Sequence, residues 1–277
     1  MMKRIRTALC LILAAALLAG CTLLPSESEP EASSPADPLT GHPLEWPGQR
    51  PVAVTIENST ASATQWGISS ASVVLEALTE AGMATELCLV YPALAATPKV
   101  GPVAAGQDIY WRLLVGQQPL PVQRGGGQFD QNYLDYYSIR AVDALEAGRT
   151  AFDCGSEWSN APLWYTSGSA ISKVLDALSI SAALTESRVT SAASAAAASA
   201  SSGSDAVLTV PALLPQEEDG KLPDATAPDA VNVRVCFDEN NATGFAYDPD
   251  SGLYRMLHAD GTPQLDANNG QQAGFDN

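Results

Sequence analysis

A segment of almost pure alanine and serine, residues 191–204, divides this 277-residue chain into two parts with different sequence patterns. The segment has no large apolar side chains to bury, so we expect a solvated linker there rather than a packed helix. We therefore predict an N-terminal domain at residues 39–186, a linker or insert rich in alanine, serine and proline at 187–230, and a small β-rich domain at 231–277.

The part before the linker alternates strand-like and helix-like patterns. Runs of β-branched and apolar residues predict strands at 51–56, 87–91 and 121–123. Spaced apolar residues predict helices at 108–115, 130–137 and 169–178, and a further helix that begins at Ser69 or Ser70 and ends at Gly82. Alternation of this kind is typical of an α/β or α+β domain, in which helices flank a mixed sheet.

The part after the linker has the pattern of an antiparallel sheet. Residues 231–237 alternate apolar and polar side chains, which predicts a half-buried strand. Residues that favour hairpin turns follow at Asn240-Asn241, 248–252, Asp260-Gly261 and Asn269-Gly270. We therefore expect a small antiparallel β domain.

The first 20 residues have the features of a secretory signal peptide. A basic start precedes an apolar stretch, residues 9–18, that is too short to span a bilayer. The sequence Leu18-Ala19-Gly20-Cys21 then matches a bacterial lipobox, which predicts cleavage before Cys21 and attachment of fatty-acyl chains through its thiol. The alternative is an ordinary signal peptide with a chance cysteine at the cleavage site.

The charge of the chain restricts its partners. Residues 21–38 are rich in serine, glutamate and proline and predict a disordered acidic tether behind the lipidated cysteine. The formal net charge of −17 repels phosphate backbones, so we expect no nucleic-acid partner. The same charge disfavours docking on anionic headgroups, so the lipid on Cys21 must provide the membrane attachment.

The cysteines and glycines do not predict a cofactor or metal site. Cys88, Cys154 and Cys236 lie far apart in sequence and form no CxxC pair, so they are either buried free thiols or one disulfide with a free thiol. Residues 125–127 are three glycines without the lysine of a phosphate loop, and they predict a turn. We assign no metal ligand, no cofactor and no catalytic residue.

Several short motifs occur in the order found in one known family. They include Pro38-Leu39-Thr40-Gly41, Arg50-Pro51-Val52-Ala53-Val54, Gln65-Trp66-Gly67-Ile68-Ser69, Lys99-Val100-Gly101-Pro102-Val103 and Asp260-Gly261-Thr262-Pro263. The chain thereby resembles the YerB-like lipoproteins of Gram-positive bacteria. The resemblance implies an N-terminal domain of unknown function, a smaller β-rich C-terminal domain, and a place at the outer face of the cytoplasmic membrane. It also implies a further strand after residue 271, so we expect a truncated or incomplete small domain.

The chain departs from the family pattern at several polar positions. The resemblance implies arginine at three positions and histidine at three more, where this chain has Glu86, Ala104, Gln107, Gln123, Leu163 and Gln264. Arginine pairs bind carboxylate or phosphate in a bidentate manner. If relatives bind an anion there, we expect this chain to have lost that site; drift at solvated positions is the alternative.

The expected function is a non-catalytic binding or scaffolding role at the cell envelope, with a protein or cell-wall partner. We select Asn58, Glu76, Arg124 and Tyr165 as candidate ligand-binding residues. The alternative is an envelope hydrolase acting on cell-wall material, with a site near Asn58, Glu76 and Arg124. On the predicted helix, Glu76 and Glu80 share a face and form either an acid–base pair or two solvated glutamates.

Overall fold

The computed structural model describes residues 35–58, 65–79, 82, 84–154, 163–185, 210–213 and 230–276. The chain divides into two compact units, Met1–Pro35 and Ala36–Asn277, and every described residue except Pro35 belongs to the second unit. The predicted signal peptide, Cys21 and most of the predicted tether and linker lie outside the described residues, as does Glu80.

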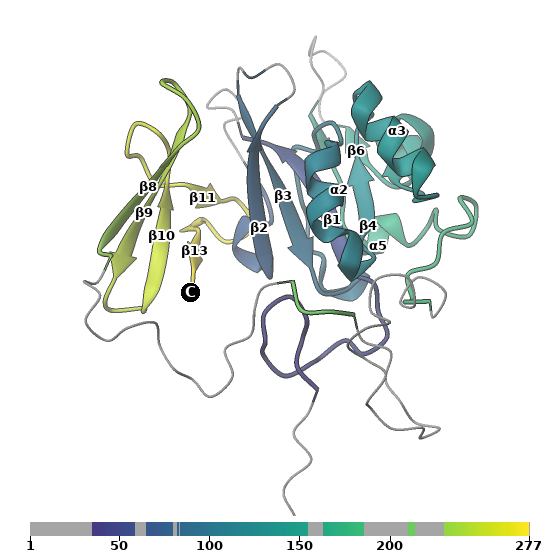
Figure 1. The fold of residues 1–277 in the computed structure, drawn as a ribbon, viewed down its shortest axis with the longest axis horizontal. Coiled ribbons are helices and arrows are strands. Elements are labelled where there is room, and N and C mark those ends of the chain that lie inside the picture. Colours follow the sequence, from purple (N-terminus) through teal and green to yellow (C-terminus); the bar gives the residue numbers. More distant parts are fainter. Residues whose placement is uncertain are drawn as a thin grey trace, which may run out of the picture. The chain divides into compact units, whose positions relative to one another are not determined.

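Five strands form a mixed sheet in the order β2-β3-β1-β4-β5 (Figure 1). They are β1 (Val52–Glu57), β2 (Val73–Leu78), β3 (Thr85–Tyr91), β4 (Leu120–Gln123) and β5 (Val142–Asp143). β3 pairs antiparallel with β1 and β2, whereas β4 pairs parallel with β1 and β5. The predicted mixed sheet with flanking helices is confirmed, and β2 forms one edge of it.

Two helices, α2 (Asp108–Leu114) and α3 (Gln128–Tyr136), pack against one face of this sheet (Figure 1). The sheet contributes Ala53, Cys88 and Val90 to this contact. The helices contribute Tyr110, Trp111, Leu114, Tyr133 and Leu134. Apolar side chains three and four positions apart share one face of a helix, and their burial holds both helices on the sheet.

The opposite face of the sheet packs on short elements and on the C-terminal strands. Val54, Ile56, Leu87 and Leu89 are fully buried there, and each contributes about 1.5–3 kcal/mol relative to an exposed side chain. The short elements are η2 (Ile68–Ser70), η3 (Leu94–Ala96), α4 (Ala144–Ala147), η5 (Gly148–Thr150), β6 (Asp153–Cys154), β7 (Trp164–Tyr165) and α5 (Gly168–Ile171). A further short helix, η4 (Val115–Gln117), directly follows α2. Met256 from the C-terminal part belongs to the same buried cluster.

The C-terminal strands form a separate antiparallel sheet in the order β13-β10-β9-β8. Its strands are β8 (Asn232–Cys236), β9 (Ala242–Asp248), β10 (Leu253–Leu257) and β13 (Gly274–Phe275), and β11 (Leu265–Asp266) pairs with β12 (Gln271–Gln272) beside it. The antiparallel sheet is confirmed. The expected half-burial of the first strand is wrong, because β8 is an edge strand and all five of its residues are exposed.

The helix predicted from Ser69 or Ser70 to Gly82 is wrong. Residues 68–70 form the short η2 helix, and residues 73–78 form β2, which pairs with β3 along its whole length. The segment contains strand-favouring valines and helix-favouring alanine and leucine, so its local preference is weak. Pairing with β3 decides the outcome. The helix predicted at 169–178 is also shorter, since α5 ends at Ile171 and turns follow.

Candidate functional site

Asn58 and Glu76, two of the four candidate residues, form a hydrogen-bonded pair. Asn58 follows β1, and its Nδ2 donates to Glu76 Oε1 and to Thr85 Oγ1, each at 2.9 Å. Thr243 Oγ1 of β9 donates to the same Glu76 oxygen at 2.8 Å. Glu76 therefore joins the edge of the five-stranded sheet to the C-terminal sheet.

The environment of Glu76 changes its acidity. Burial raises the pKa of the Glu76 carboxyl above its usual value, while the hydrogen bonds from Thr85, Thr243 and Asn58 oppose this shift without cancelling it. A carboxyl group with a raised pKa that is held by three donors is a feature of binding and catalytic sites.

Two cavities open beside this pair. The first, which we call the amide cleft, has a volume of about 170 Å³. It is lined by Asn58, Ala84, Thr85, Asn240, Asn241, Ala242, Thr243, Met256, Leu257, His258, Ala259 and Gln264. Amide and hydroxyl groups supply most of its polar atoms, and such groups bind neutral polar ligands through directed hydrogen bonds.

The second cavity, which we call the β2 groove, has a volume of about 560 Å³. From the N-terminal part of the chain it is lined by Leu39, Thr40, His42, Ser69, Ala71, Ser72, Val73, Val74 and Glu76. From the C-terminal sheet and the residues around it, it is lined by Phe245, Leu253, Met256, Gly274, Phe275 and Asp276. Glu76 contacts both the groove and, through Asn58 and Thr243, the lining of the amide cleft.

A buried polar clamp, formed by Gln65, Gln264 and Asp266, holds the C-terminal part beside Glu76. Gln264 Nε2 donates to Gln65 Oε1, and Gln65 Nε2 donates to Asn58 Oδ1 at 3.2 Å. The fully buried Asp266 carboxylate accepts from the backbone N–H of Ser69 at 2.8 Å. In the sequence, Gln264 stands out only as a departure from the family pattern. The clamp could not be predicted, because no local pattern links residues almost 200 positions apart.

Tyr165, the third candidate residue, belongs to an aromatic cluster. Its ring meets the Trp66 ring edge-on, with centroids 6.4 Å apart, and Lys99 Nζ lies 3.7 Å from the Trp66 centroid and 4.8 Å from that of Tyr165. Burial, together with the negative charges of Glu57 and Asp153, raises the pKa of Tyr165. Lys99 thus makes a stable cation–π arrangement with both rings, and it occupies the ring faces of Trp66 and Tyr165.

Arg124, the fourth candidate residue, does not belong to the hydrogen-bonded group around Glu76. Its backbone N–H donates to Ala104 O at 2.8 Å, and its Nε is buried with no hydrogen-bond partner among the described residues. No hydrogen bond or ion pair between described side chains joins it to Asn58 or Glu76. The structure thus brings two of the four candidate residues together and places Tyr165 and Arg124 in other surroundings.

Four of the departures from the family pattern converge near Arg124. Gln107 Nε2 donates to Glu86 Oε2, and Ala104 O accepts from Arg124 N. Gln123 packs against Gly106, which adjoins Gln107, and its Nε2 donates to the buried Asp130 carboxylate at 2.9 Å. Burial raises the pKa of Asp130, whose second oxygen accepts from Trp111 Nε1 at 2.5 Å. No hydrogen bond between described residues joins Leu163 to this cluster.

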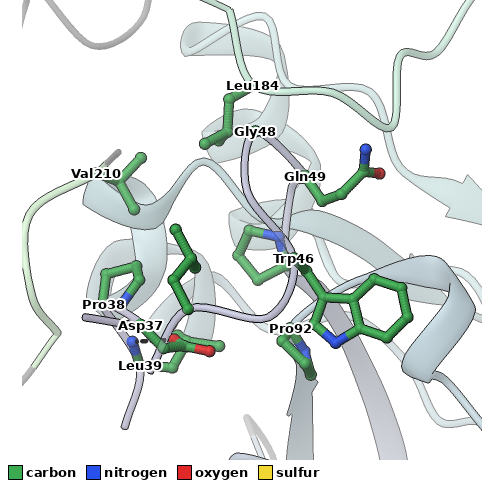
Figure 2. Close-up of a pocket in the computed structure, with 11 residues that line it drawn as sticks. Asp37, Pro38, Leu39, Trp46, Gly48, Gln49, Pro92, Leu184 and Val210 are labelled. Carbon is green, nitrogen blue, oxygen red and sulfur yellow. Dashed lines mark hydrogen bonds between the residues drawn. The ribbon is translucent and has the colours of Figure 1, made fainter. Parts of the chain in front are cut away.

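A small apolar pocket lies near the start of the described chain (Figure 2). Its volume of about 30 Å³ is close to that of a water molecule, so it is too small for an organic ligand. Pro38, Trp46 and Pro92 line it together with Leu184 and Val210, as Figure 2 shows. Val210 lies inside the predicted linker, so part of that segment packs on the body of the protein.

Two further features concern metals and membranes. The described residues contain no group of three or more histidine, cysteine, aspartate or glutamate side chains that could hold a metal ion. Within the same ranges, no helix is long and apolar enough to cross a bilayer. Cys88, Cys154 and Cys236 are free thiols, of which Cys88 alone is fully buried.

The sheet order and the C-terminal β unit define an α+β protein of a recognisable family. The family described as "Protein of unknown function (DUF3048) N-terminal domain" matches residues 39–181, which is more than half of the chain. The chain belongs to this family, and the YerB-like resemblance is confirmed.

A solved structure supports the same fold. The crystal structure of the YerB protein from Bacillus subtilis is similar to this chain, with a TM-score of 0.66 and 23% sequence identity. The similarity covers 87% of this chain and 72% of that one. No curated protein matches the chain.

Proposed function

We propose that this protein is a lipid-anchored envelope protein that binds its ligand, without catalysis, at the surface around Asn58 and Glu76. The observation that carries the binding role is the Glu76 carboxylate, which donors from both sheets hold between two cavities. A carboxyl group buried at a junction is costly unless it is paired. Occupation of the adjoining cavity by a ligand that donates hydrogen bonds would supply a further partner.

The anchoring part of the proposal rests on the lipobox Leu18-Ala19-Gly20-Cys21. Cells grown with an alkyne-labelled fatty acid are expected to label the wild-type protein, which fractionates with membranes. Cys21→Ser is expected to lose both the label and the membrane fractionation, while the control Cys236→Ser keeps both. Labelling of Cys21→Ser at the wild-type level would contradict the proposed anchor.

The binding part is tested by thermal unfolding in the presence of soluble cell-wall fragments and of peptides. A ligand that binds only the folded state raises the unfolding temperature, and the rise grows with the ratio of free ligand concentration to Kd. The wild type is expected to show such a rise, and Glu76→Ala is expected to lose it. Glu239→Ala, which removes an exposed carboxylate from the C-terminal part, serves as the charge-matched control. Equal responses of all three proteins would refute a ligand site at Glu76.

The envelope hydrolase remains the second candidate, favoured by one observation. The raised pKa of Glu76 is the property that a general acid requires near neutral pH. No hydrogen bond or ion pair between described residues joins Arg124, the partner expected for it, to Glu76. Release of soluble fragments from purified cell wall by the wild type, and its loss in Glu76→Gln, would favour the hydrolase over the binding protein.

A further inference from the structure

The free edge of β2 presents unpaired backbone groups in a defined order. The backbone N–H of Thr79 donates to Ala84 O, which continues the β2–β3 ladder beyond its last paired residues. Hydrogen-bonded pairs alternate along an antiparallel ladder, so every second residue counted back from Thr79 bonds to β3. The residues between them, Val74, Glu76 and Leu78, therefore direct their backbone N–H and C=O groups away from β3. No strand among the described residues pairs with this edge.

The β2 groove lies along this edge. Its volume of about 560 Å³ falls in the range of ligand sites, roughly 300–1,000 Å³. Val74 forms its wall on β2, and Phe245, Met256 and Phe275 form the opposite apolar wall. An added strand would place alternate side chains against these walls while its backbone pairs with Val74 and Glu76.

The charge around the groove selects the kind of strand. Glu76 and Asp276 are the carboxylates of its lining, and His42 lies 3.7 Å from Asp276. None of its described lining residues is lysine or arginine, and the chain carries a net charge of −17. A segment with positive charge is therefore attracted to this edge, and an acidic one is repelled.

We propose that the β2 groove binds an extended basic polypeptide segment, which adds to the sheet as a strand beside β2. The proposal rests on the binding role argued above and names the class of its ligand. The segment alternates apolar residues, which face Phe245 and Phe275, with lysine or arginine residues. Its backbone supplies the hydrogen bonds that the free edge lacks.

The test uses the full-length protein in detergent and a synthetic peptide, acetyl-Val-Lys-Val-Lys-Val-Lys-Val-amide, with binding measured by fluorescence anisotropy. Two further peptides carry N-methyl groups on the backbone of either every valine or every lysine. Only one set of amides in an added strand faces its neighbour. One of the methylated peptides is therefore expected to lose binding and the other to keep it. Retention by both would overturn the proposal, and so would equal binding of a peptide with glutamate in place of lysine.

A protein variant tests the edge itself. Val74→Pro removes an N–H that points away from β3, so it leaves the β2–β3 ladder intact, since proline is tolerated at such edge positions. It is expected to weaken peptide affinity about tenfold. The matched control is Asn232→Pro at the start of β8, whose N–H points to the free edge of the other sheet. Equal affinity of the two variants would contradict the proposal.

Amide hydrogen exchange on the unmodified protein gives a measurement that does not depend on the folding of a variant. Addition of the peptide is expected to slow exchange at Val74 and Glu76 about tenfold or more. The amides of β8 are expected to remain unchanged. Unchanged exchange at Val74 and Glu76 with bound peptide would overturn the assignment of the site.

Two other outcomes distinguish the binding of a basic strand from the general binding role proposed for the Glu76 site. If the peptide does not bind, but cell-wall fragments stabilise the wild type and not Glu76→Ala, the binding role stands and the inference is wrong. A dimer in sedimentation that the peptide does not dissociate would show that a second copy occupies the edge, and it would also overturn the inference.

Discussion

The carboxylate of Asp266 accepts a hydrogen bond from the backbone N–H of Ser69, with an Oδ2–N distance of 2.8 Å, across 197 positions of sequence. Its other oxygen accepts from the N–H groups of Gly67 at 3.1 Å and Asn268 at 2.9 Å. Asp266 has no exposed surface. A single buried side chain thus joins the C-terminal strands to the turn that precedes β2.

Removal of this carboxylate is expected to weaken the whole protein. Asp266→Ala leaves three backbone N–H groups without their acceptor, and hydrogen bonds to charged groups contribute about 1.5–3 kcal/mol each. We expect the free energy of unfolding in urea to fall by at least about 3 kcal/mol. The control is Asp260→Ala, which removes an exposed carboxylate that accepts hydrogen bonds from Thr262 of its own turn. This substitution should cause a much smaller loss. Equal losses in the two variants would contradict the role of the clamp.

Glu76 is expected to make stability depend on pH with a definite sign. Its pKa is raised above the usual 4.5 in the folded state, so the folded protein binds this proton more tightly than the unfolded chain. The stabilising contribution is therefore complete below about pH 4.5 and is lost as pH rises through the raised pKa. Urea unfolding of the wild type and of Glu76→Gln, at pH values from below 4.5 upward, measures this contribution to stability.

The comparison of the two proteins isolates Glu76. Burial shifts the pKa of Asp130 in the same direction, so the pH dependence of the wild type alone combines both groups. The difference in stability between wild type and Glu76→Gln should change in favour of the variant as pH rises. A difference that is constant with pH would show that burial does not perturb Glu76.

Gly106 is expected to tolerate no side chain. A Cβ at this position would overlap the Gln123 amide and lie 2.6 Å from Asp130 Oδ1, so the cluster around Asp130 would have to move. Overpacking of this kind costs about 1–3 kcal/mol, and we expect this loss for Gly106→Ala in thermal or urea unfolding. Gly116→Ala is the control, because no atom lies within 4 Å of its Cβ. A neutral Gly106→Ala would contradict the packing around Asp130.

The three described cysteines are expected to react with a maleimide at different rates. Cys236 is exposed and should react first, whereas Cys88 is buried and its raised pKa suppresses the reactive thiolate. Mass spectrometry of peptides after short labelling should find modified Cys236 and unmodified Cys88, with Cys154 between them. Denatured protein, in which Cys88 reacts fully, is the control. Equally fast labelling of Cys88 and Cys236 in the folded protein would contradict the packing of β3.

Much of the fold was predictable because its signals are local. The apolar period of residues 108–115 identifies α2 and the inward side chains Tyr110, Trp111 and Leu114. The turn residues at 248–252 identify the hairpin of β9 and β10. In the candidate site, the selection of Asn58 and Glu76 needed only the ordered motifs of the family, and their pairing came from the fold.

The remaining features depend on contacts between distant residues. Residues 73–78 have side chains suited to a helix or a strand, and only the ladder with β3 makes them a strand. That strand exposes the edge beside the β2 groove, which a helix would not possess.

The sequence by itself determined the family, through the order of its motifs. It also determined the mixed sheet with its flanking helices, the antiparallel C-terminal unit and most turns, because neighbouring residues indicate these through local backbone preference and apolar period. The tertiary structure alone decided that residues 73–78 form a strand and not a helix. It also decided the Gln65–Gln264 and Asp266 contacts and the separation of Arg124 from Glu76. Such contacts form only when the burial of a shared core brings distant segments together, and their hydrogen bonds leave no periodic trace in the sequence.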